Sequence, residues 1–106
     1  LKFQDFDFYE FHEAFAAQTL CFLKAMNDKQ YNKKFFYSNK VHGEIDMKKL
    51  NLVGSSLAYG HPFAATGGRI LGVCEKLIRE NKDLNRGLIA ICTAGGMGVS
   101  AIVERY

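Results

Sequence analysis

A single imidazole, His61, lies inside a stretch of small residues that suits chemistry on an anionic or developing anionic group. The stretch Asn51–Arg69 reads NLVGSSLAYGHPFAATGGR and places His61 between Gly60 and Pro62. Small residues permit backbone geometries that bulkier residues avoid, and they let a ligand approach the main chain closely. An apolar, helix-periodic segment follows, so His61 stands at the entrance to a helix, where exposed N–H groups favour negative charge. A purely structural histidine does not require such surroundings.

His12 and Cys92 are the two other reactive side chains that stand at the ends of predicted elements. His12 falls where an alternating aromatic segment changes to helical periodicity, and Cys92 closes the apolar run LIAICT. Taken singly, each has an ordinary structural explanation, since a cysteine in a buried strand commonly serves as a small hydrophobic residue. Cys21 and Cys74 fall on or beside helical apolar stripes, and we expect both in the core.

Two other kinds of site are disfavoured by spacing. Zinc sites need closely spaced ligand pairs such as C-x-x-C, which the sequence lacks, so we expect no metal. The glycines at Gly95, Gly96 and Gly98 could suggest a phosphate-binding loop. However, the Lys-Ser/Thr pair of that motif is missing, and the glycines lie between two predicted strands rather than before a helix.

Hydrophobic periodicity predicts the elements that position these groups. Strands are expected at 6–11, 52–59, 88–93 and 99–103, and helices at 13–27 and 65–81. This β-α-β-α-β-β order predicts an α/β fold in which helices pack on a mixed sheet. Seven of the ten lysines lie between Lys24 and Lys49, a surface segment with a short helix near 30–36. These lysines either are simply solvated or contact ligand phosphates or a partner subunit.

The composition describes an ordinary globular domain, 106 residues long with a net charge of +3. This mild charge does not argue for nucleic acid, but it suits an anionic small ligand. Three cysteines without paired spacing favour a reducing compartment. No apolar run approaches the ~20 residues that cross a bilayer, and no signal peptide is visible. Because the chain opens on Leu1 within an apolar pattern, we expect it to be the end piece of a longer protein.

Three motifs occur in the order and spacing of the C-terminal half of a thiolase, which the chain resembles over nearly its whole length. They are HEAFAAQ (His12–Gln18), the stretch Asn51–Arg69, and GLIAICTAGGMG (Gly87–Gly98). With His before EAFA, and with GHPFAATG, the chain is most similar to the 3-ketoacyl-CoA thiolase subunits of fatty-acid β-oxidation complexes, the trifunctional-protein β-subunit type. The resemblance implies a layered α-β-α half-domain over residues 1–106, with the N-terminal thiolase domain absent.

The resemblance also implies a role for each matching residue. His61 corresponds to the base that activates the nucleophilic cysteine, and Cys92 to the acid/base at the substrate α-carbon. His12 corresponds to a position that helps form an oxyanion hole through a bound water. The backbone at Ala94, Gly95 and Gly96 would form the second oxyanion hole. Coenzyme A enters as co-substrate, and no other cofactor is implied.

The sequence departs from the family pattern in three ways. Ser55 and Ser56 replace a second Gly and a small residue, and Ala64 replaces a frequent Gly. More seriously, none of the three cysteines has the context of the family's nucleophile, which belongs to the N-terminal half. We therefore expect the 106 residues alone to be inactive.

Other assignments remain open beside cleavage of 3-ketoacyl-CoA with CoA in fatty-acid β-oxidation. They are an acetoacetyl-CoA thiolase, a ketoacyl synthase, and a non-catalytic thiolase-like domain for lipid binding or assembly. Cys92 before Ala94-Gly95-Gly96 argues against a synthase, and retention of His12, His61 and Cys92 argues against a non-catalytic domain. The implied partners are acyl-CoA and CoA, a homodimer or tetramer, and a hydratase/dehydrogenase α-subunit. We expect a cytoplasmic location, with the mitochondrial matrix as the alternative.

Overall fold

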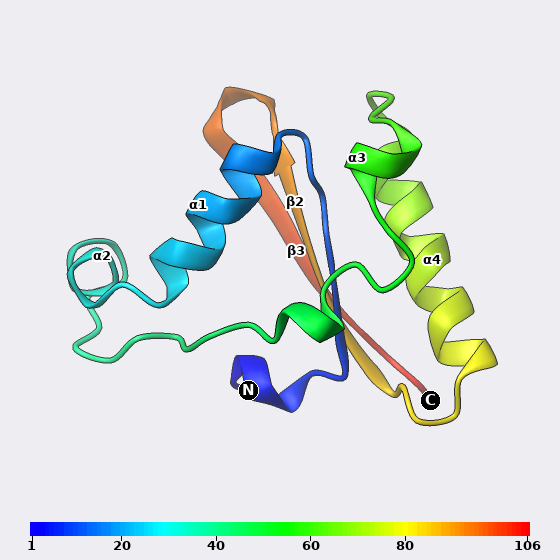
Figure 1. The fold of residues 1–106 in the computed structure, drawn as a ribbon, viewed down its shortest axis with the longest axis horizontal. Helices are drawn as coiled ribbons and strands as arrows, with labels where there is room; N and C mark the ends of the chain where they lie inside the picture. Colours follow the sequence, from blue (N-terminus) through cyan, green and yellow to red (C-terminus); the bar gives the residue numbers. More distant parts are fainter.

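A three-stranded mixed sheet forms the middle layer of the computed structural model, which describes residues 1–106 (Figure 1). Its strands are β1 (Phe8–Phe11), β2 (Arg86–Thr93) and β3 (Met97–Glu104), in the order β1-β2-β3. β1 runs parallel to the central strand β2, and β3 runs antiparallel to it. The predicted α/β class with a mixed sheet is confirmed.

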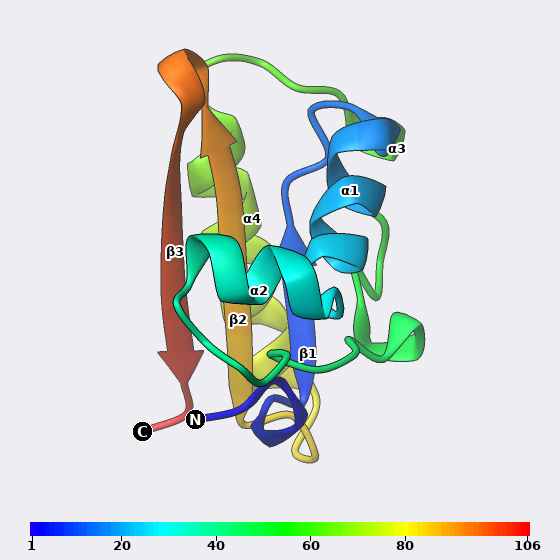
Figure 2. The same cartoon turned by 90° about the vertical axis from the view of Figure 1, so that its left-hand side faces the viewer.

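Helices cover both faces of this sheet (Figure 2). On one face lie α1 (Ala16–Met26) and α2 (Lys29–Phe35), and on the other lies α4 (Thr66–Glu80). The short α3 (Ser56–Tyr59) precedes α4, and 3₁₀ turns occupy Phe3–Asp5, Met47–Lys49 and Ala94–Gly96. The layered α-β-α arrangement that the resemblance implies is therefore observed.

Strand β1 is buried on both sides because its side chains alternate between the two helical layers. Tyr9 and Phe11 belong to the cluster that faces α1, where the Phe11 ring meets Phe22 edge to face with 5.3 Å between ring centroids. Phe8 belongs to the opposite cluster, together with Ile70 and Cys74 of α4. This single strand thus ties the two layers together.

The predicted strand at 52–59 is wrong. Extended pairing is limited to one parallel bridge between Leu50 and Tyr9, and residues 56–59 form α3 instead. The reason is local, because Asn51 and Gly54 adopt the left-handed conformation, with φ of 49° and 84°. Two such residues three positions apart turn the chain away from the sheet before a strand can extend.

Two expectations on α1 also need correction. The helix begins at Ala16 rather than at Glu13, because the preceding residue, Phe15, has an extended backbone with φ of −146° and ψ of 139°. The Glu13 carboxylate accepts hydrogen bonds from Asn51 and Leu57. Cys21 is exposed rather than in the core, since the buried positions of α1 are Thr19 and Met26. Cys74 is buried, as predicted.

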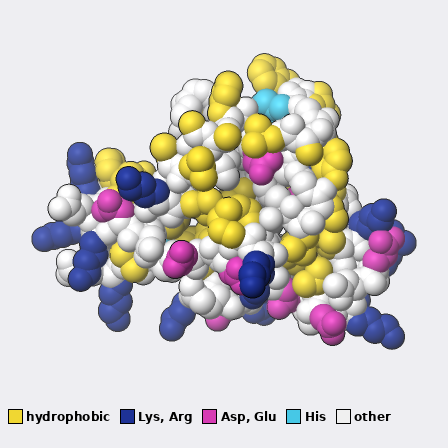
Figure 3. All heavy atoms as spheres, viewed as in Figure 1, with side chains coloured by type: hydrophobic (Ala, Val, Ile, Leu, Met, Phe, Trp, Pro, Cys, Tyr) yellow, Lys and Arg dark blue, Asp and Glu magenta, His cyan; other side chains and the backbone are white.

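The lysine-rich segment lies on the surface, and its short predicted helix is α2. Lys and Arg side chains project into solvent around α2, on the left of Figure 3. Lys49 is an exception, because its Nζ donates to the carbonyl oxygen of Phe6 at 2.9 Å. None of the helices combines the length and the apolar character that a membrane span requires.

Gly87 allows β1 and β2 to pair closely, and its replacement gives the first prediction. A Cβ atom at position 87 would lie 2.3 Å from Cζ of the fully buried Phe8, so Gly87→Ala should destabilise the protein by about 1–3 kcal/mol. Gly72→Ala is the matched control, because a Cβ there meets nothing within 4 Å. That change should stabilise α4 by about 0.5–1 kcal/mol. Urea unfolding of both variants measures the difference, and a neutral Gly87→Ala would contradict this packing.

Candidate active site

The carboxyl end of β1 is held by side chains from the turn at 51–56. Asn51 closes a pair of hydrogen bonds on Phe11, accepting from its N–H at 2.8 Å and donating to its carbonyl oxygen at 3.2 Å. Ser55 donates to the same carbonyl oxygen at 3.0 Å. These contacts join segments about forty residues apart, so the turn is fixed against the strand rather than free at the surface.

Glu13 reinforces this attachment from the other side of His12. One of its carboxylate oxygens accepts from the Asn51 side chain at 2.8 Å, and the other accepts from the Leu57 N–H at 3.2 Å. The second contact lies at the start of α3, where main-chain N–H groups lack helical partners and favour a negative charge. His12 is therefore flanked on both sides by residues that anchor the His61 segment.

The structure brings His12 and His61 into direct contact. Their Nε2 atoms are 3.3 Å apart, with 4.1 Å between the ring centroids. His12 follows β1 directly, and its N–H donates to the carbonyl oxygen of Ala90 on β2 at 2.8 Å. His12 is buried, whereas His61 is exposed, so the pair links the interior to the surface.

Three polar side chains to which the sequence assigns no functional role surround the imidazole pair. Ser56 Oγ lies 2.6 Å from His12 Nδ1, and Arg69 Nη2 lies 2.9 Å from the same oxygen. On the far side, Thr66 Oγ1 lies 3.2 Å from His61 Nδ1. All three fall inside the stretch that the sequence marks as functional. The sequence of this stretch, however, does not indicate which of its side chains face the imidazole pair.

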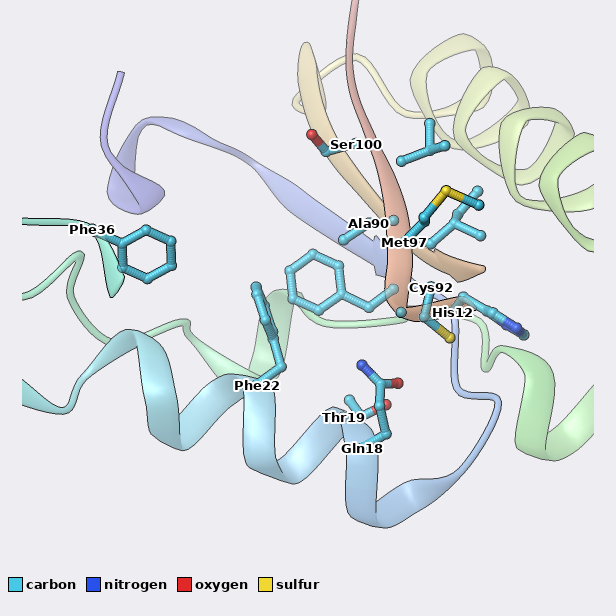
Figure 4. A pocket seen from close by; sticks show the side chains of 14 residues that line it. His12, Gln18, Thr19, Phe22, Phe36, Ala90, Cys92, Met97 and Ser100 are labelled. Atoms are coloured by element: carbon cyan, nitrogen blue, oxygen red, sulfur yellow. The ribbon is translucent and has the colours of Figure 1, made fainter. Parts of the chain in front are cut away.

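Cys92 lies in a cavity of about 550 Å³ that it shares with His12 (Figure 4). Gln18 and Thr19 of α1 line the cavity opposite the ends of β1 and β2, and Met97 of β3 lines it as well. His61 is not among the lining residues; it reaches this cavity only through its contact with His12. The structure thus brings two of the three predicted groups into one cavity and joins the third to them.

The predicted second oxyanion loop is the turn that joins β2 to β3. Ala94–Gly96 forms a 3₁₀ turn in which Gly95 and Gly96 have φ of 78° and 73°. These positive values favour glycine, because a Cβ would strain the left-handed backbone. Gly96 lines the cavity that holds Cys92, so part of this turn reaches the same space.

Electrostatics keep the His12 ring neutral. Burial lowers the pKa of His12, and electrostatic interactions with His61 and Arg69 lower it further, against an opposing effect of Glu13. A neutral imidazole retains one N–H and one lone pair, which is the state in which it can donate and accept at once.

A buried carboxyl group, Glu10, lies beneath the site on the α4 side of β1. Burial raises the pKa of Glu10 to about 7, although the positive charge of Arg69 acts in the opposite direction. Neither Glu10 carboxyl oxygen, nor Nε or Nη1 of Arg69, has a protein hydrogen-bond partner. Burial, followed by the charge of Glu10, also raises the pKa of Cys74 to about 12, which leaves that thiol protonated and unreactive.

The arrangement is suited to proton transfer beside a polarised carbonyl group. Two imidazole nitrogens converge on one point, and a thiol stands in the adjoining cavity. An imidazole can remove a proton from a thiol near neutral pH, a second N–H can stabilise an oxyanion, and a thiol can deliver or remove a proton at carbon. The site has no cluster of metal-ligating side chains.

Comparison with known proteins gives matches over nearly the whole chain. The family model "Thiolase, C-terminal domain" matches residues 1–105. A 3-ketoacyl-CoA thiolase from Shewanella baltica is 47% identical over 105 residues, which cover 98% of this chain and 24% of that protein. One from Shewanella piezotolerans is 46% identical over the same shares. The chain therefore spans about a quarter of the length of these curated relatives.

A solved structure gives the same result at the level of the fold. The Bacillus anthracis acetyl-CoA acetyltransferase matches with a TM-score of 0.67 and 32% identity. The match covers 95% of this chain and 21% of that structure.

Glu10 gives a prediction for the dependence of stability on pH. Its pKa is raised from 4.5 to about 7 in the folded state, so the folded protein holds a proton that the unfolded chain releases. Stability is therefore greatest below pH 4.5 with respect to this group, and it falls as pH rises to about 7. Glu10→Gln should remove this fall, which amounts to about 3 kcal/mol at most. Urea unfolding between these pH values measures it.

Glu44→Gln, at an exposed glutamate, controls for the general effect of removing a carboxylate. If the free energy of unfolding of the wild-type protein and of Glu10→Gln followed the same pH curve, the buried carboxyl group would have no effect of this kind.

Proposed function

The chain belongs to the thiolase family, as its C-terminal domain, and we propose that it supplies part of the catalytic site of a 3-ketoacyl-CoA thiolase. The proposed reaction cleaves a 3-ketoacyl-CoA with CoA to acetyl-CoA and a shortened acyl-CoA, as in fatty-acid β-oxidation. The names of the similar Shewanella proteins support the 3-ketoacyl substrate class.

One observation carries this proposal: His12 and His61 meet at 3.3 Å, and His12 shares a cavity with Cys92. A retro-Claisen cleavage needs a base for a nucleophilic thiol, a donor for an oxyanion and an acid for the leaving enolate. These three side chains have the chemistry for those three tasks, and the fold gathers them from positions 12, 61 and 92.

The first half of the proposed reaction uses the imidazole pair. His61 takes the proton of a cysteine thiol that lies outside residues 1–106, and the thiolate attacks the 3-keto carbon of the substrate. The charge that develops on the keto oxygen is stabilised by hydrogen bonding on the His12 side, directly or through a water. The bond between C2 and C3 then breaks, which leaves the acyl group on the cysteine sulfur and the electron pair on the thioester enolate.

The second half uses Cys92. Its thiol gives a proton to C2 of the enolate, so that acetyl-CoA forms, while His61 helps hold the thioester oxygen and the Ala94–Gly96 backbone serves as the second oxyanion hole. The Cys92 thiolate next takes the proton of incoming CoA, and the CoA thiolate attacks the acyl group. The departing cysteine thiolate recovers its proton from His61, which restores every group to its starting state.

The assembly and location that accompany this function are part of the same proposal. We expect a homodimer or tetramer, together with a hydratase/dehydrogenase α-subunit, in the cytoplasm. The bacterial origin of the similar 3-ketoacyl-CoA thiolases supports the location.

Replacement of the Cys92 thiol tests the proposed acid/base role. Cys92→Ser in the full-length protein should lower kcat for thiolysis of a 3-ketoacyl-CoA by about 10²–10⁴-fold, since a serine hydroxyl is a far weaker acid than a thiol. Cys21→Ser is the matched control, because that thiol is exposed on α1 outside the cavity. It should leave kcat unchanged. Near-normal turnover by Cys92→Ser would refute the role.

A further inference from the structure

An unbroken path of hydrogen-bonding groups runs through the imidazole pair, from Arg69 at one end to the carbonyl oxygen of Pro62 at the other. We propose that Arg69 and Ser56 are positioning residues that fix His12 as the tautomer with its hydrogen on Nε2. The assignment of the tautomer stands on geometry, whereas its consequence for catalysis rests on the proposed function.

The first end of the path determines which nitrogen of His12 is bare. A guanidinium group has donors only, so Arg69 Nη2, 2.9 Å away, donates to Ser56 Oγ. The hydroxyl then has one hydrogen to give. Its other hydrogen-bond contact is His12 Nδ1, at 2.6 Å, and both residues are buried. Ser56 therefore donates to Nδ1, and the neutral His12 ring carries its hydrogen on Nε2.

The second end determines the state of His61 independently. The Thr66 hydroxyl donates its single hydrogen to the carbonyl oxygen of Pro62 at 3.1 Å, which is an acceptor only. Toward His61 Nδ1, at 3.2 Å, Thr66 can then act only as an acceptor. His61 therefore carries its hydrogen on Nδ1, and its Nε2 presents a lone pair.

The two assignments agree where they meet. Between the two Nε2 atoms, 3.3 Å apart, there is one hydrogen, donated by His12 and accepted by His61. The opposite direction fails at both ends. It would leave the Ser56 hydrogen without an acceptor, and it would require Thr66 to give one hydrogen to two partners. The lowered pKa of His12 supports a ring with a single hydrogen.

This direction gives each imidazole the state that the proposed reaction needs. In this arrangement the His12 N–H and the His61 lone pair satisfy each other; separation of the two nitrogens frees the N–H for an oxyanion and the lone pair for the nucleophilic thiol. Arg69 makes no hydrogen bond to either ring. It acts through Ser56, because without its donation the hydroxyl is free to accept from Nδ1–H, and His12 can adopt the other tautomer.

Nitrogen-15 NMR of the imidazole rings tests the assignment directly. The full-length protein is labelled at histidine, and the three histidines of this segment are assigned by single His→Gln variants. At a pH where His12 is neutral, its Nδ1 should resonate as an unprotonated nitrogen and its Nε2 as a protonated one, with the reverse in His61. A protonated Nδ1 in the wild-type His12 ring overturns the proposal without any variant.

Two pairs of variants then test the positioning residues. Ser56→Thr keeps the hydroxyl, and Ser56→Val replaces it with a methyl group of equal size. The His12 Nδ1 signal should therefore shift from its wild-type position in the Ser56→Val variant and keep that position in the Ser56→Thr variant. Arg69→Met should shift that signal toward a mixture of tautomers. Arg79→Met, on the same helix, should not, because Arg79 is exposed and pairs with Glu75 rather than with Ser56. Equal His12 Nδ1 signals in the Ser56→Thr and Ser56→Val variants would overturn the role of Ser56.

Thiolysis by the same proteins separates this inference from the proposed function. Ser56→Val should lower kcat about tenfold relative to Ser56→Thr, with KM unchanged. A tenfold loss corresponds to the free energy of about one hydrogen bond. A protein that shows the expected tautomers but no thiolysis supports the positioning network and overturns the proposed function. Equal kcat in the two variants overturns the catalytic consequence of the network.

Discussion

Attachment of the turn at 51–56 to the carboxyl end of β1 is the constraint on which the site depends. The main-chain groups of Phe11 are saturated by Asn51 and Ser55, and this leaves the next residue, His12, directed at the segment that carries His61. Each such contact contributes only about 1 kcal/mol. Together they hold two imidazoles, 49 positions apart, at 3.3 Å. The short helix α3 and the first turn of the long helix α4 then carry Ser56, Thr66 and Arg69 to the flanks of the pair.

The same attachment explains why polar side chains are tolerated in so small a core. Serine, threonine and histidine side chains are buried around the site, and each that belongs to the path has a hydrogen-bond partner. A satisfied polar network rigidifies its members, whereas an unsatisfied one is costly. Thr19 departs from this rule, and so do the charged residues Glu10 and Arg69, because all three hold buried polar atoms without a protein partner. The opposite charges of Glu10 and Arg69, on neighbouring layers, offset part of that cost.

The sequence predicts most of the scaffold because its signals are local and periodic. Alternation in β1, the stripe that gives α4 and the apolar run of β2 all correspond to observed elements. The segment at 52–59 misled the prediction because a short apolar run suits a strand and a helix equally well, and only the left-handed Asn51 and Gly54 decide between them. The motifs marked His12, His61 and Cys92. Ser56 and Arg69 stayed hidden, since their importance lies in contacts that connect distant parts of the chain.

A double-mutant cycle on thiolysis by the full-length protein tests most directly whether the two imidazoles act as one unit. His12→Ala and His61→Ala are measured singly and together as kcat/KM. Because His12 donates to the nitrogen that serves as the base, the double variant should lose little more than the worse single variant, which should itself lose about 10²-fold or more. If instead the two losses multiplied, the histidines would act independently, and their contact at 3.3 Å would be no more than packing.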